Sequence, residues 1–460
     1  MPDNNKTFFE RLNAWIRNSI TLKLVSIGIL ILLLLIPAFM IEDLIRNREY
    51  TSSDAIEEVS SKWGEAQTIS GPVLAVPYKK YYKKDKDIVE VIEYAHFLPD
   101  ELKISGKVDP EYRHRGIFEV VVYTSKLHIE GKFSQPSFSG WPVDTNLILW
   151  KDAFVYTGIS DMRGINENIA LNWSAGQVND HLLFNPGTGI KPSTSYDESG
   201  SGNMISETGV STRVNLGTPD DTGKLFQFSF ELSLNGSKKL FFSPLGKETN
   251  VTLESPWPDP GFDGAFLPDE RTVSEKGFSA KWKVLHLNRN YPQQWLGTEY
   301  RISESTFGVN LLVPVDHYQK STRAAKYAVL IITLTFLVFF FVEILNKQRI
   351  HPFQYILVGL AICIFYTLLI SISEHLSFNL AYFISGVAVI AAITAYSLSM
   401  FTSKLPTILL GLIMVAIYGF IFIIIQLQDY ALLTGSIGLF LVLLVVMYIS
   451  RKINWYSAAE

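Results

Sequence analysis

The sequence predicts a membrane protein with six transmembrane helices and a large β-rich, sandwich-like domain inserted between the first and second of them. Apolar residues are concentrated near 24–41 and 327–449. The apolar runs are about 20 residues long, which at about 1.5 Å of helical rise per residue matches the hydrocarbon core of a bilayer. The chain between them mixes short alternating segments with turn residues and is long enough to bury its own core.

Composition excludes some classes of protein. The chain has 460 residues and a net charge of −4. A nucleic-acid-binding protein would carry a concentrated basic excess, so no nucleic-acid partner is expected. Cys363 is the single cysteine, so the chain forms no intramolecular disulfide.

The N-terminus is expected to remain as an uncleaved anchor. Residues 1–23 form a cytoplasmic amphipathic segment that either lies on the membrane surface or simply begins the first span. The span itself covers residues 24–41. It leads into Glu42 and Asp43 rather than a small-residue cleavage site, which argues against a signal peptide. Basic residues hold this end in the cytoplasm: Lys6, Arg11, Arg17 and Lys23.

Residues 42–325 are predicted to form the β-rich domain. The polar stretch 46–65 is compatible with an extension of the first helix. Beyond it, β-branched and aromatic runs between turn residues indicate strands at 73–82, 117–123, 126–133, 225–234, 249–253 and 278–287. The Ser- and Gly-rich segment 193–212 is expected to be a loop. The basic and aromatic run 79–86 is interpreted as a solvated hairpin tip, with contact to lipid headgroups or an acidic envelope polymer as the alternative.

Residues 326–450 are predicted to form a bundle of five spans, followed by a cytoplasmic tail at 451–460. The short connections alternate in charge. Basic residues on one side are Lys347, Arg349, Lys404, Arg451 and Lys452, whereas Glu374, His375 and Asp429 lie on the other. Short basic loops stay in the cytoplasm, so both termini are expected there and the large domain in the periplasm of a bacterium.

Two groups of polar residues at the ends of the spans are candidate sites, because ionisable groups are expensive within a membrane. Glu343, His351 and Gln354 lie at the cytoplasmic ends of the second and third spans. There we expect a structural polar hairpin, with an interhelical hydrogen bond between Glu343 and His351. Ser371, Glu374 and His375 lie at the periplasmic end of the third span. They have the residue types of a nucleophile, an acid and a base, but a polar helix cap explains them as well.

No other catalytic or metal motif is found. His96, His114, His128, His181 and His286 lack the spacing of metal ligands. Phosphate loops and nucleophile elbows are absent from the sequence. Asp161 and Arg163 are interpreted as a structural turn pairing. We therefore expect no cofactor and no metal.

Motifs across the chain resemble those of the CreD family of bacterial inner-membrane proteins. They are Leu35-Ile-Pro, Ser70-Gly-Pro-Val-Leu-Ala-Val-Pro, Arg115-Gly-Ile-Phe-Glu-Val-Val-Val-Tyr, Ser160-Asp-Met-Arg-Gly-Ile, Asn235-Gly-Ser, 257–268, Glu343, Arg349-Ile-His-Pro-Phe-Gln-Tyr-Ile-Leu-Val-Gly-Leu, Phe365-Tyr, Ser371-Ile-Ser-Glu-His and Asp429-Tyr-Ala-Leu-Leu-Thr-Gly-Ser. The resemblance implies a role in cell-envelope integrity under a stress or carbon-source response. It implies no particular reaction.

Three functions remain open at this point. The leading hypothesis is a non-enzymatic scaffold, sensor or assembly factor of the envelope. The alternatives are a membrane enzyme acting on lipid-linked or peptidoglycan substrates at the periplasmic face, and a transporter or flippase. The expected partners are the lipid bilayer and either envelope polymers or other envelope proteins.

Overall fold

The computed structural model describes residues 20–84, 87–175, 178–190, 208–217, 224–297, 300, 302–311, 317–346, 350–401, 404–427 and 430–451. The chain divides into two compact units. The membrane unit comprises Met1–Ser53 and Val315–Glu460, and the β unit comprises Asp54–Pro314. Several sequence-based expectations fall outside the described residues: the segment 1–19, Lys347, Arg349, Asp429, Lys452 and most of the 193–212 loop.

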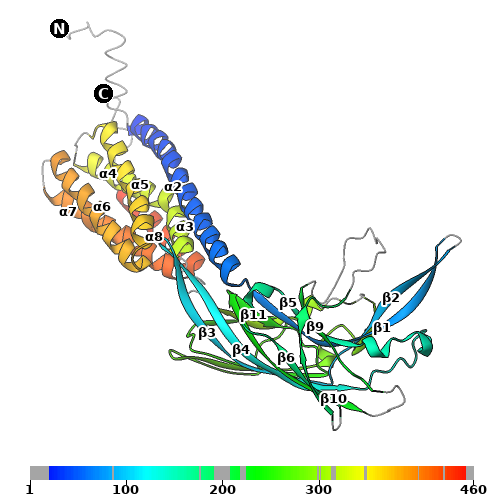
Figure 1. Cartoon of the computed structure of the whole chain (residues 1–460). Helices are drawn as coiled ribbons and strands as arrows, with labels where there is room; N and C mark the ends of the chain where they lie inside the picture. The colour runs from blue at the N-terminus through cyan, green and yellow to red at the C-terminus, as the bar shows by residue number, and fades with distance from the viewer. Residues whose placement is uncertain are drawn as a thin grey trace, which may run out of the picture. The chain divides into compact units, whose positions relative to one another are not determined.

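Six helices of the described chain are long and apolar enough to cross a bilayer. One is near the N-terminus and five are near the C-terminus, which confirms the predicted arrangement. A short helix, α3, precedes the five (Figure 1). The helices are α2 (Ile20–Trp63), α3 (His317–Lys326), α4 (Ala328–Leu345), α5 (Pro352–Ser373), α6 (Phe378–Met400), α7 (Lys404–Gln426) and α8 (Ala431–Ser450).

The first helix is much longer than the predicted span at 24–41. It continues through the polar residues 46–63, because no glycine or proline interrupts them before Gly64, where the chain turns with a φ of 150°. Four buried side chains lie along one face of α2 within the membrane unit: Ile27, Leu34, Ile41 and Ile45. Their spacing of seven, seven and four residues is that of a helix packed along a continuous seam.

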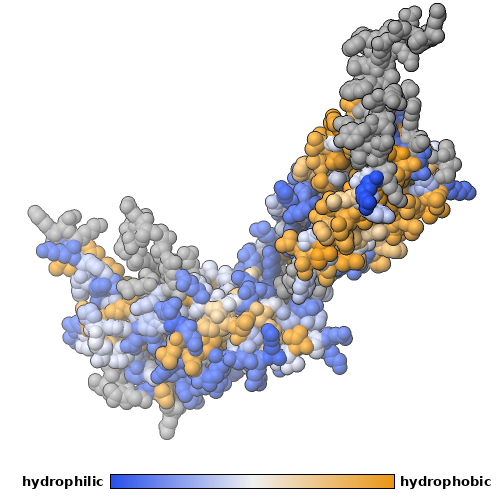
Figure 2. All heavy atoms as spheres, turned by 180° about the vertical axis from the view of Figure 1, so that it is seen from behind, coloured by the Kyte–Doolittle hydropathy of each residue, from blue (hydrophilic) through white to orange (hydrophobic). Residues whose placement is uncertain are grey.

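Large side chains fill the interior of the membrane unit. Aromatic rings cluster at two levels, one around Phe336 and Tyr355 and the other around Phe365 and Tyr418. The outer surface of the helices is hydrophobic where Figure 2 shows it, as expected for surfaces that face lipid. Exposed examples on α6, α7 and α8 are Phe383, Leu412 and Leu432.

The β unit contains two mixed sheets that enclose one hydrophobic core, in the manner of a sandwich. The nine-stranded sheet consists of β1 (Gln67–Lys84), β2 (Asp87–Phe97), β5 (Phe154–Ile159), β8 (Asn185–Pro186), β9 (Gly209–Arg213), β11 (Lys239–Phe242), β13 (Pro260–Gly264), β16 (Gln294–Leu296) and β17 (Phe307–Leu311). The eight-stranded sheet consists of β3 (Glu101–Arg115), β4 (Phe118–Ser134), β6 (Ala170–Ala175), β7 (Val178–Leu183), β10 (Leu225–Ser237), β12 (Glu248–Ser255), β14 (Glu270–Ser274) and β15 (Gly277–Leu285).

Most neighbouring strands are antiparallel, and the pairs β1–β11 and β3–β12 are parallel. Aromatic side chains join the two sheets across the core. Trp282 of β15 contacts Phe307 of β17 and Phe262 of β13, with ring centroids 5.8 Å apart in both pairs. Such ring contacts add to the burial of apolar area that holds the sandwich together.

Two strand predictions need correction. The segments expected at 117–123 and 126–133 belong to one strand, β4, because polar residues between them continue the ladder with β3 and β10. The predicted loop at 193–212 ends earlier than expected, since residues from Gly209 onward form β9.

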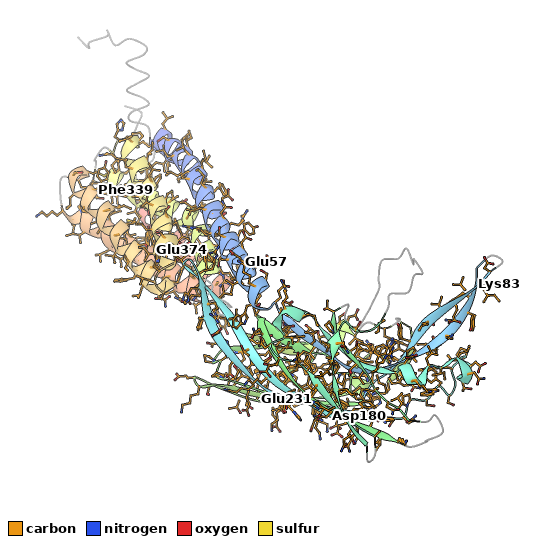
Figure 3. All side chains as sticks on the ribbon, viewed as in Figure 1. Glu57, Lys83, Asp180, Glu231, Phe339 and Glu374 are labelled. Carbon is orange, nitrogen blue, oxygen red and sulfur yellow. The ribbon has the colours of Figure 1, made fainter. Side chains whose placement is uncertain are left out.

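The described part of this run, 79–84, lies in a hairpin between β1 and β2, which projects from the β unit (Figure 1). Two of its lysines are already paired within the hairpin. Lys79 pairs with Glu90 at 2.9 Å, and Lys80 pairs with Glu93 at 3.1 Å. Lys83 lies near the end of the hairpin (Figure 3).

Candidate functional site

A buried carboxylate lies within the membrane unit. Glu343, near the end of α4, has a side chain only 4% exposed. Lys23 Nζ of α2 is 2.7 Å from its Oε1, and the Tyr355 hydroxyl of α5 donates to its Oε2 at 3.1 Å. Each carboxylate oxygen therefore has a donor, and these contacts join three helices. We call this group the Glu343 cluster.

His351 and Gln354 form the start of α5 instead of bonding to Glu343. His351 Nδ1 accepts from the backbone N–H of Phe353 at 3.2 Å, and Gln354 Oε1 accepts from the backbone N–H of His351 at 2.9 Å. Pro352 occupies the first helical position, where no backbone donor is needed. The expected hydrogen bond between Glu343 and His351 does not occur among the described residues. Tyr355, one turn further along α5, takes that place.

The Glu343 cluster borders a pocket of about 620 Å³ between α2, α4 and α5. Its lining is mainly apolar, and its polar members are Lys23, Ser26, Glu343, His351 and Tyr355. The apolar lining includes Val25, Ile27, Ile29, Leu30 and Ile350. A pocket with these proportions suits a ligand that has both an apolar and a polar part.

A second charged contact lies at the opposite end of α5. Arg48 Nε of α2 is 3.3 Å from Glu374 Oε1, and the Glu374 side chain is 7% exposed. The Tyr318 hydroxyl of α3 makes a longer contact of 3.5 Å with the same oxygen. We call this group the Glu374 cluster; Glu374 is labelled in Figure 3.

The structure does not bring the candidate catalytic residues together. Ser371 and His375 are exposed at the end of α5, whereas Glu374 is turned toward Arg48. No hydrogen bond joins Ser371, Glu374 and His375 in the part of the chain that the structure describes. The neighbouring Ser373 donates to the carbonyl of Ile370, as a serine at the end of a helix commonly does. No base is hydrogen-bonded to the Ser371 hydroxyl among the described residues.

The two clusters lie at the ends of the α2 seam. Lys23 and Arg48 are 25 residues apart, which corresponds to about 38 Å along a helix. Midway, Leu34 is fully buried against Gly359 of α5, where an added Cβ would lie 2.1 Å from Leu34 Cδ1. Glycine allows close approach of helices in membranes, so this position is a hole that receives Leu34.

In the β unit, the last turn of α2 is held by Arg163 and Asp161. The guanidinium of Arg163 donates to the carbonyl of Ser61 at 2.7 Å and to Glu65 at 2.7 Å, and it pairs with Asp161 at 2.9 Å. Asp161 also accepts from the backbone N–H of Glu65. Burial raises the pKa of the Asp161 carboxyl, but the hydrogen bonds from Arg163 and from the backbone outweigh it, so the pKa is lowered. This turn pairing agrees with the interpretation from the sequence and adds a role in holding α2.

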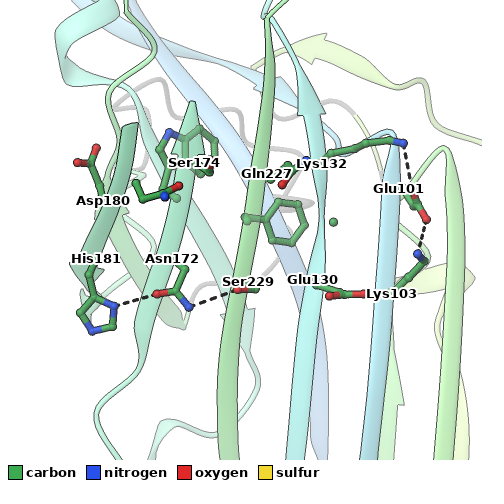
Figure 4. A pocket seen from close by; sticks show the side chains of 14 residues that line it. Glu101, Lys103, Glu130, Lys132, Asn172, Ser174, Asp180, His181, Gln227 and Ser229 are labelled. Carbon is green, nitrogen blue, oxygen red and sulfur yellow. Dashed lines mark hydrogen bonds and ion pairs between the residues drawn. The ribbon is translucent and has the colours of Figure 1, made fainter. Parts of the chain in front are cut away.

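A polar groove of about 610 Å³ crosses the outer face of the eight-stranded sheet (Figure 4). Strand register aligns two rows of side chains across β3, β4, β10, β6 and β7. One row is Lys103, Glu130, Ser229, Asn172 and His181, and the other is Glu101, Lys132, Gln227, Ser174 and Asn179. Asn172 accepts from His181 at 2.9 Å and donates to Ser229 at 3.3 Å. Lys103 and Lys132 both pair with Glu101, and the lining also contains Glu130 and Asp180. The groove therefore has donors and acceptors, with three acidic side chains against two lysines.

The histidines are dispersed through the β unit and the membrane unit. Among the described residues, no group of three or more His, Cys, Asp or Glu side chains is arranged to hold a metal ion. His96 is the most buried of them; its Nδ1 is 3.1 Å from the Tyr156 hydroxyl, and its ring stacks on Trp295. Burial lowers the pKa of His96 to about 4.

Sequence reasoning identified Glu343 and Glu374 but not their partners on α2. It assigned Lys23 to the orientation of the N-terminus and gave Arg48 no role. The seven-residue spacing of Ile27, Leu34 and Ile41, with a basic residue beyond each end, was the available signal.

Comparison with known proteins gives consistent results over nearly the whole length. A family model described as inner membrane protein CreD matches residues 19–456. The inner membrane protein CreD of Escherichia coli (strain K12) is 31% identical over 446 residues, which cover 95% of this chain and 93% of that protein.

Proposed function

Since the chain belongs to the CreD family of inner membrane proteins, we propose that it supports cell-envelope integrity without catalysing a reaction. Its role is that of a scaffold or sensor that carries a β-rich domain on a bundle of membrane helices. The β unit lies in the periplasm and both termini lie in the cytoplasm. The charge of the short connections supports this orientation, because Lys404 and Arg451 flank connections on one side and Glu374 ends α5 on the other.

The observation that carries the proposal is the fastening of α2. One helix contributes residues to both units, from Ile20 in the membrane unit to Trp63 in the β unit. It is held by the Glu343 and Glu374 clusters in the first unit and by Arg163 in the second. A helix held by contacts within each unit joins the β unit to its membrane anchor, which supports the scaffold role.

The groove of the β unit supplies a surface for an envelope partner. Neighbouring strands are about 4.8 Å apart, so a row of five side chains extends about 19 Å across the sheet. A neutral, hydroxyl-rich polymer such as an envelope glycan would meet hydrogen-bonding groups at each strand. Paired charges and amide side chains favour such a polymer over a strongly charged one.

The enzyme alternative receives little support from the site. Nucleophilic catalysis needs a base within hydrogen-bond reach of the hydroxyl, and Ser371 is exposed without such a partner among the described residues. Glu374 is engaged by Arg48. These contacts suit a helix end that is fixed in place.

A charge-exchange experiment tests the scaffold role. Arg48→Glu places two carboxylates together and should reduce survival under envelope stress, and Arg48→Glu with Glu374→Arg should restore it. Cells that carry Ser371→Ala should survive envelope stress as well as cells with the parent protein. The same is expected for Ser399→Ala, a matched change at another exposed serine of the bundle. Loss of protection in Ser371→Ala at normal membrane abundance would instead favour an enzyme.

Reporter fusions test the orientation separately. A reporter active only in the periplasm should be active after Leu287 and after His375, and silent at the C-terminus. Activity at the C-terminus would reverse the orientation.

A further inference from the structure

The pocket beside the Glu343 cluster has the features of a specific lipid site. It is formed within the membrane unit by α2, α4 and α5. Its polar groups are gathered at Lys23, Glu343, His351 and Tyr355, and the rest of its lining is mainly apolar. Val25 and Ile29 are 53% and 58% exposed, so an apolar chain can reach the pocket along the outer face of α2.

The polar groups present donors to the pocket. Glu343 is 4% exposed, and both of its oxygens already accept hydrogen bonds. Lys23 is the more accessible member of the ion pair, with a side chain 31% exposed. An ammonium group has three N–H donors, and the bond to Glu343 uses one of them. Both members of the pair line the pocket, and Lys23 is the member with N–H groups that the bond to Glu343 does not use.

His351 adds a donor whose position follows from its tautomer. Its Nδ1 accepts from the backbone N–H of Phe353, so that nitrogen carries no proton. In a neutral imidazole the proton is then on Nε2, which is a donor. No hydrogen bond of Nε2 is found among the described residues. Lys23 and His351 thus offer N–H groups to the same pocket.

We propose that this pocket binds an anionic phospholipid, with the phosphate between Lys23 and His351 and one acyl chain along Val25 and Ile29. Charge-assisted hydrogen bonds from an ammonium and an imidazole suit a phosphate oxygen. The apolar lining suits the chain. A free amine is a poorer occupant, because Glu343, the one carboxylate among the described lining residues, is buried and already bonded. The site goes beyond the scaffold role and does not depend on it.

The test uses the full-length protein in detergent micelles and counts bound lipids by native mass spectrometry. The probes are dioleoylphosphatidylglycerol and dioleoylphosphatidylcholine, added in competition. We expect at least about tenfold preference for phosphatidylglycerol in the first binding event, the ratio that about 1.4 kcal/mol produces. Equal binding of the two lipids would overturn the proposal.

Variants identify the groups responsible. His351→Asp keeps a good N-cap for α5 but replaces the donor with a negative charge, so the preference should fall to near one. His351→Asn keeps both an N-cap acceptor and a donor and should retain most of it. Arg46→Gln is the control: it also removes a positive charge from α2, but in an exposed contact with Asp43, and it should leave the preference for phosphatidylglycerol unchanged.

Two further arms separate the remaining explanations. Lys23→Gln with Glu343→Gln keeps a hydrogen-bonded pair while removing the ammonium, and it should lose the preference even if His351→Asp fails to fold. Inorganic phosphate in excess should not displace phosphatidylglycerol. Displacement by phosphate would mean that the pocket binds a small anion. An unchanged preference in His351→Asp and in the Lys23→Gln, Glu343→Gln double variant would mean that the lipid binds elsewhere. Either result overturns the lipid site.

Discussion

Removal of Lys23 should destabilise the protein more than its partial exposure suggests. In Lys23→Met, the Glu343 carboxylate keeps the Tyr355 hydroxyl as its one donor among the described residues while remaining 4% exposed. Breaking a buried ion pair by removing one partner costs about 3–5 kcal/mol. Lys23 is about one-third exposed, and water screens part of the interaction, so we expect about 2 kcal/mol.

The partner change should cost less. Glu343→Gln retains an oxygen that accepts from Tyr355, and Lys23 can extend its ammonium toward water, so we expect about 1 kcal/mol. The double variant should resemble Glu343→Gln, because it leaves no unpaired buried charge. The interaction energy of the cycle is then about 2 kcal/mol, within the range for residues in direct contact.

Reversible unfolding of the full chain in mixed micelles, followed by the loss of helical circular dichroism, measures these differences. Arg46→Met serves as a control, since the contact of Arg46 with Asp43 is exposed and 3.7 Å long, and it should change stability by less than about 0.5 kcal/mol. The reasoning is refuted if Lys23→Met has no greater effect than Arg46→Met, or if the effects of the two single changes simply add.

Three other predictions concern separate contacts. Gly359→Ala should lower stability in the same assay by about 1–3 kcal/mol, because its Cβ would lie 2.1 Å from Leu34 Cδ1; Leu34→Ala in the same chain should recover part of that loss, and simple additivity would argue against the contact. His96 has a folded pKa of about 4, so the unfolded state binds a proton first as the pH falls from about 6.5, and stability should decline by up to about 1.4 kcal/mol per pH unit down to about pH 4. His96→Gln should flatten this acid dependence in fluorescence-monitored unfolding, and an unaltered slope would contradict the assignment. Arg163→Lys cannot keep all three partners of the guanidinium, so hydrogen exchange at the Glu65 amide should accelerate about tenfold, as expected for a loss of about 1.5 kcal/mol; unchanged exchange would remove Arg163 from the fastening of α2.

The membrane spans could be predicted from sequence because length and hydropathy decide them. An apolar run of about 20 residues has few alternatives to a spanning helix. The end of α2 was harder to predict, since residues 46–63 are polar and their helix is stabilised by contacts in the β unit. Arg163, about 100 residues away in sequence, bonds to the carbonyl of Ser61 at its last turn. Local sequence does not contain that contact.

The strands of the β unit could be recognised, but their order could not. Alternation in 225–234 gives a half-buried strand, and the structure extends it as β10. The pairing of β1 with β11 joins Gln67 to Leu240 in a parallel ladder. Pairings at such separation depend on how the whole core packs, so hydrophobic pattern alone leaves many arrangements open.

Only part of the candidate site could be predicted, again because some of its contacts join residues that are far apart in the sequence. Glu343 could be selected because a carboxylate in a spanning helix needs a partner. His351 follows eight residues later, at the start of the next span, and was expected to be that partner. In the structure the partners of Glu343 are Tyr355, on the same helix that His351 caps, and Lys23, which is 320 residues away in the chain. His351 instead caps α5, where its backbone position makes it the natural acceptor for Phe353.

The two ion pairs and the Leu34 contact together determine how α2 sits along the bundle. Charged pairs lie at the ends of the seam, where side chains can reach water, and the middle relies on packing into the space at Gly359. A shift of α2 by one turn, about 5.4 Å, would separate Lys23 from Glu343 and Arg48 from Glu374 at once. It would also move Leu34 away from Gly359. Because all three contacts fail together, the seam specifies a single register for the first helix.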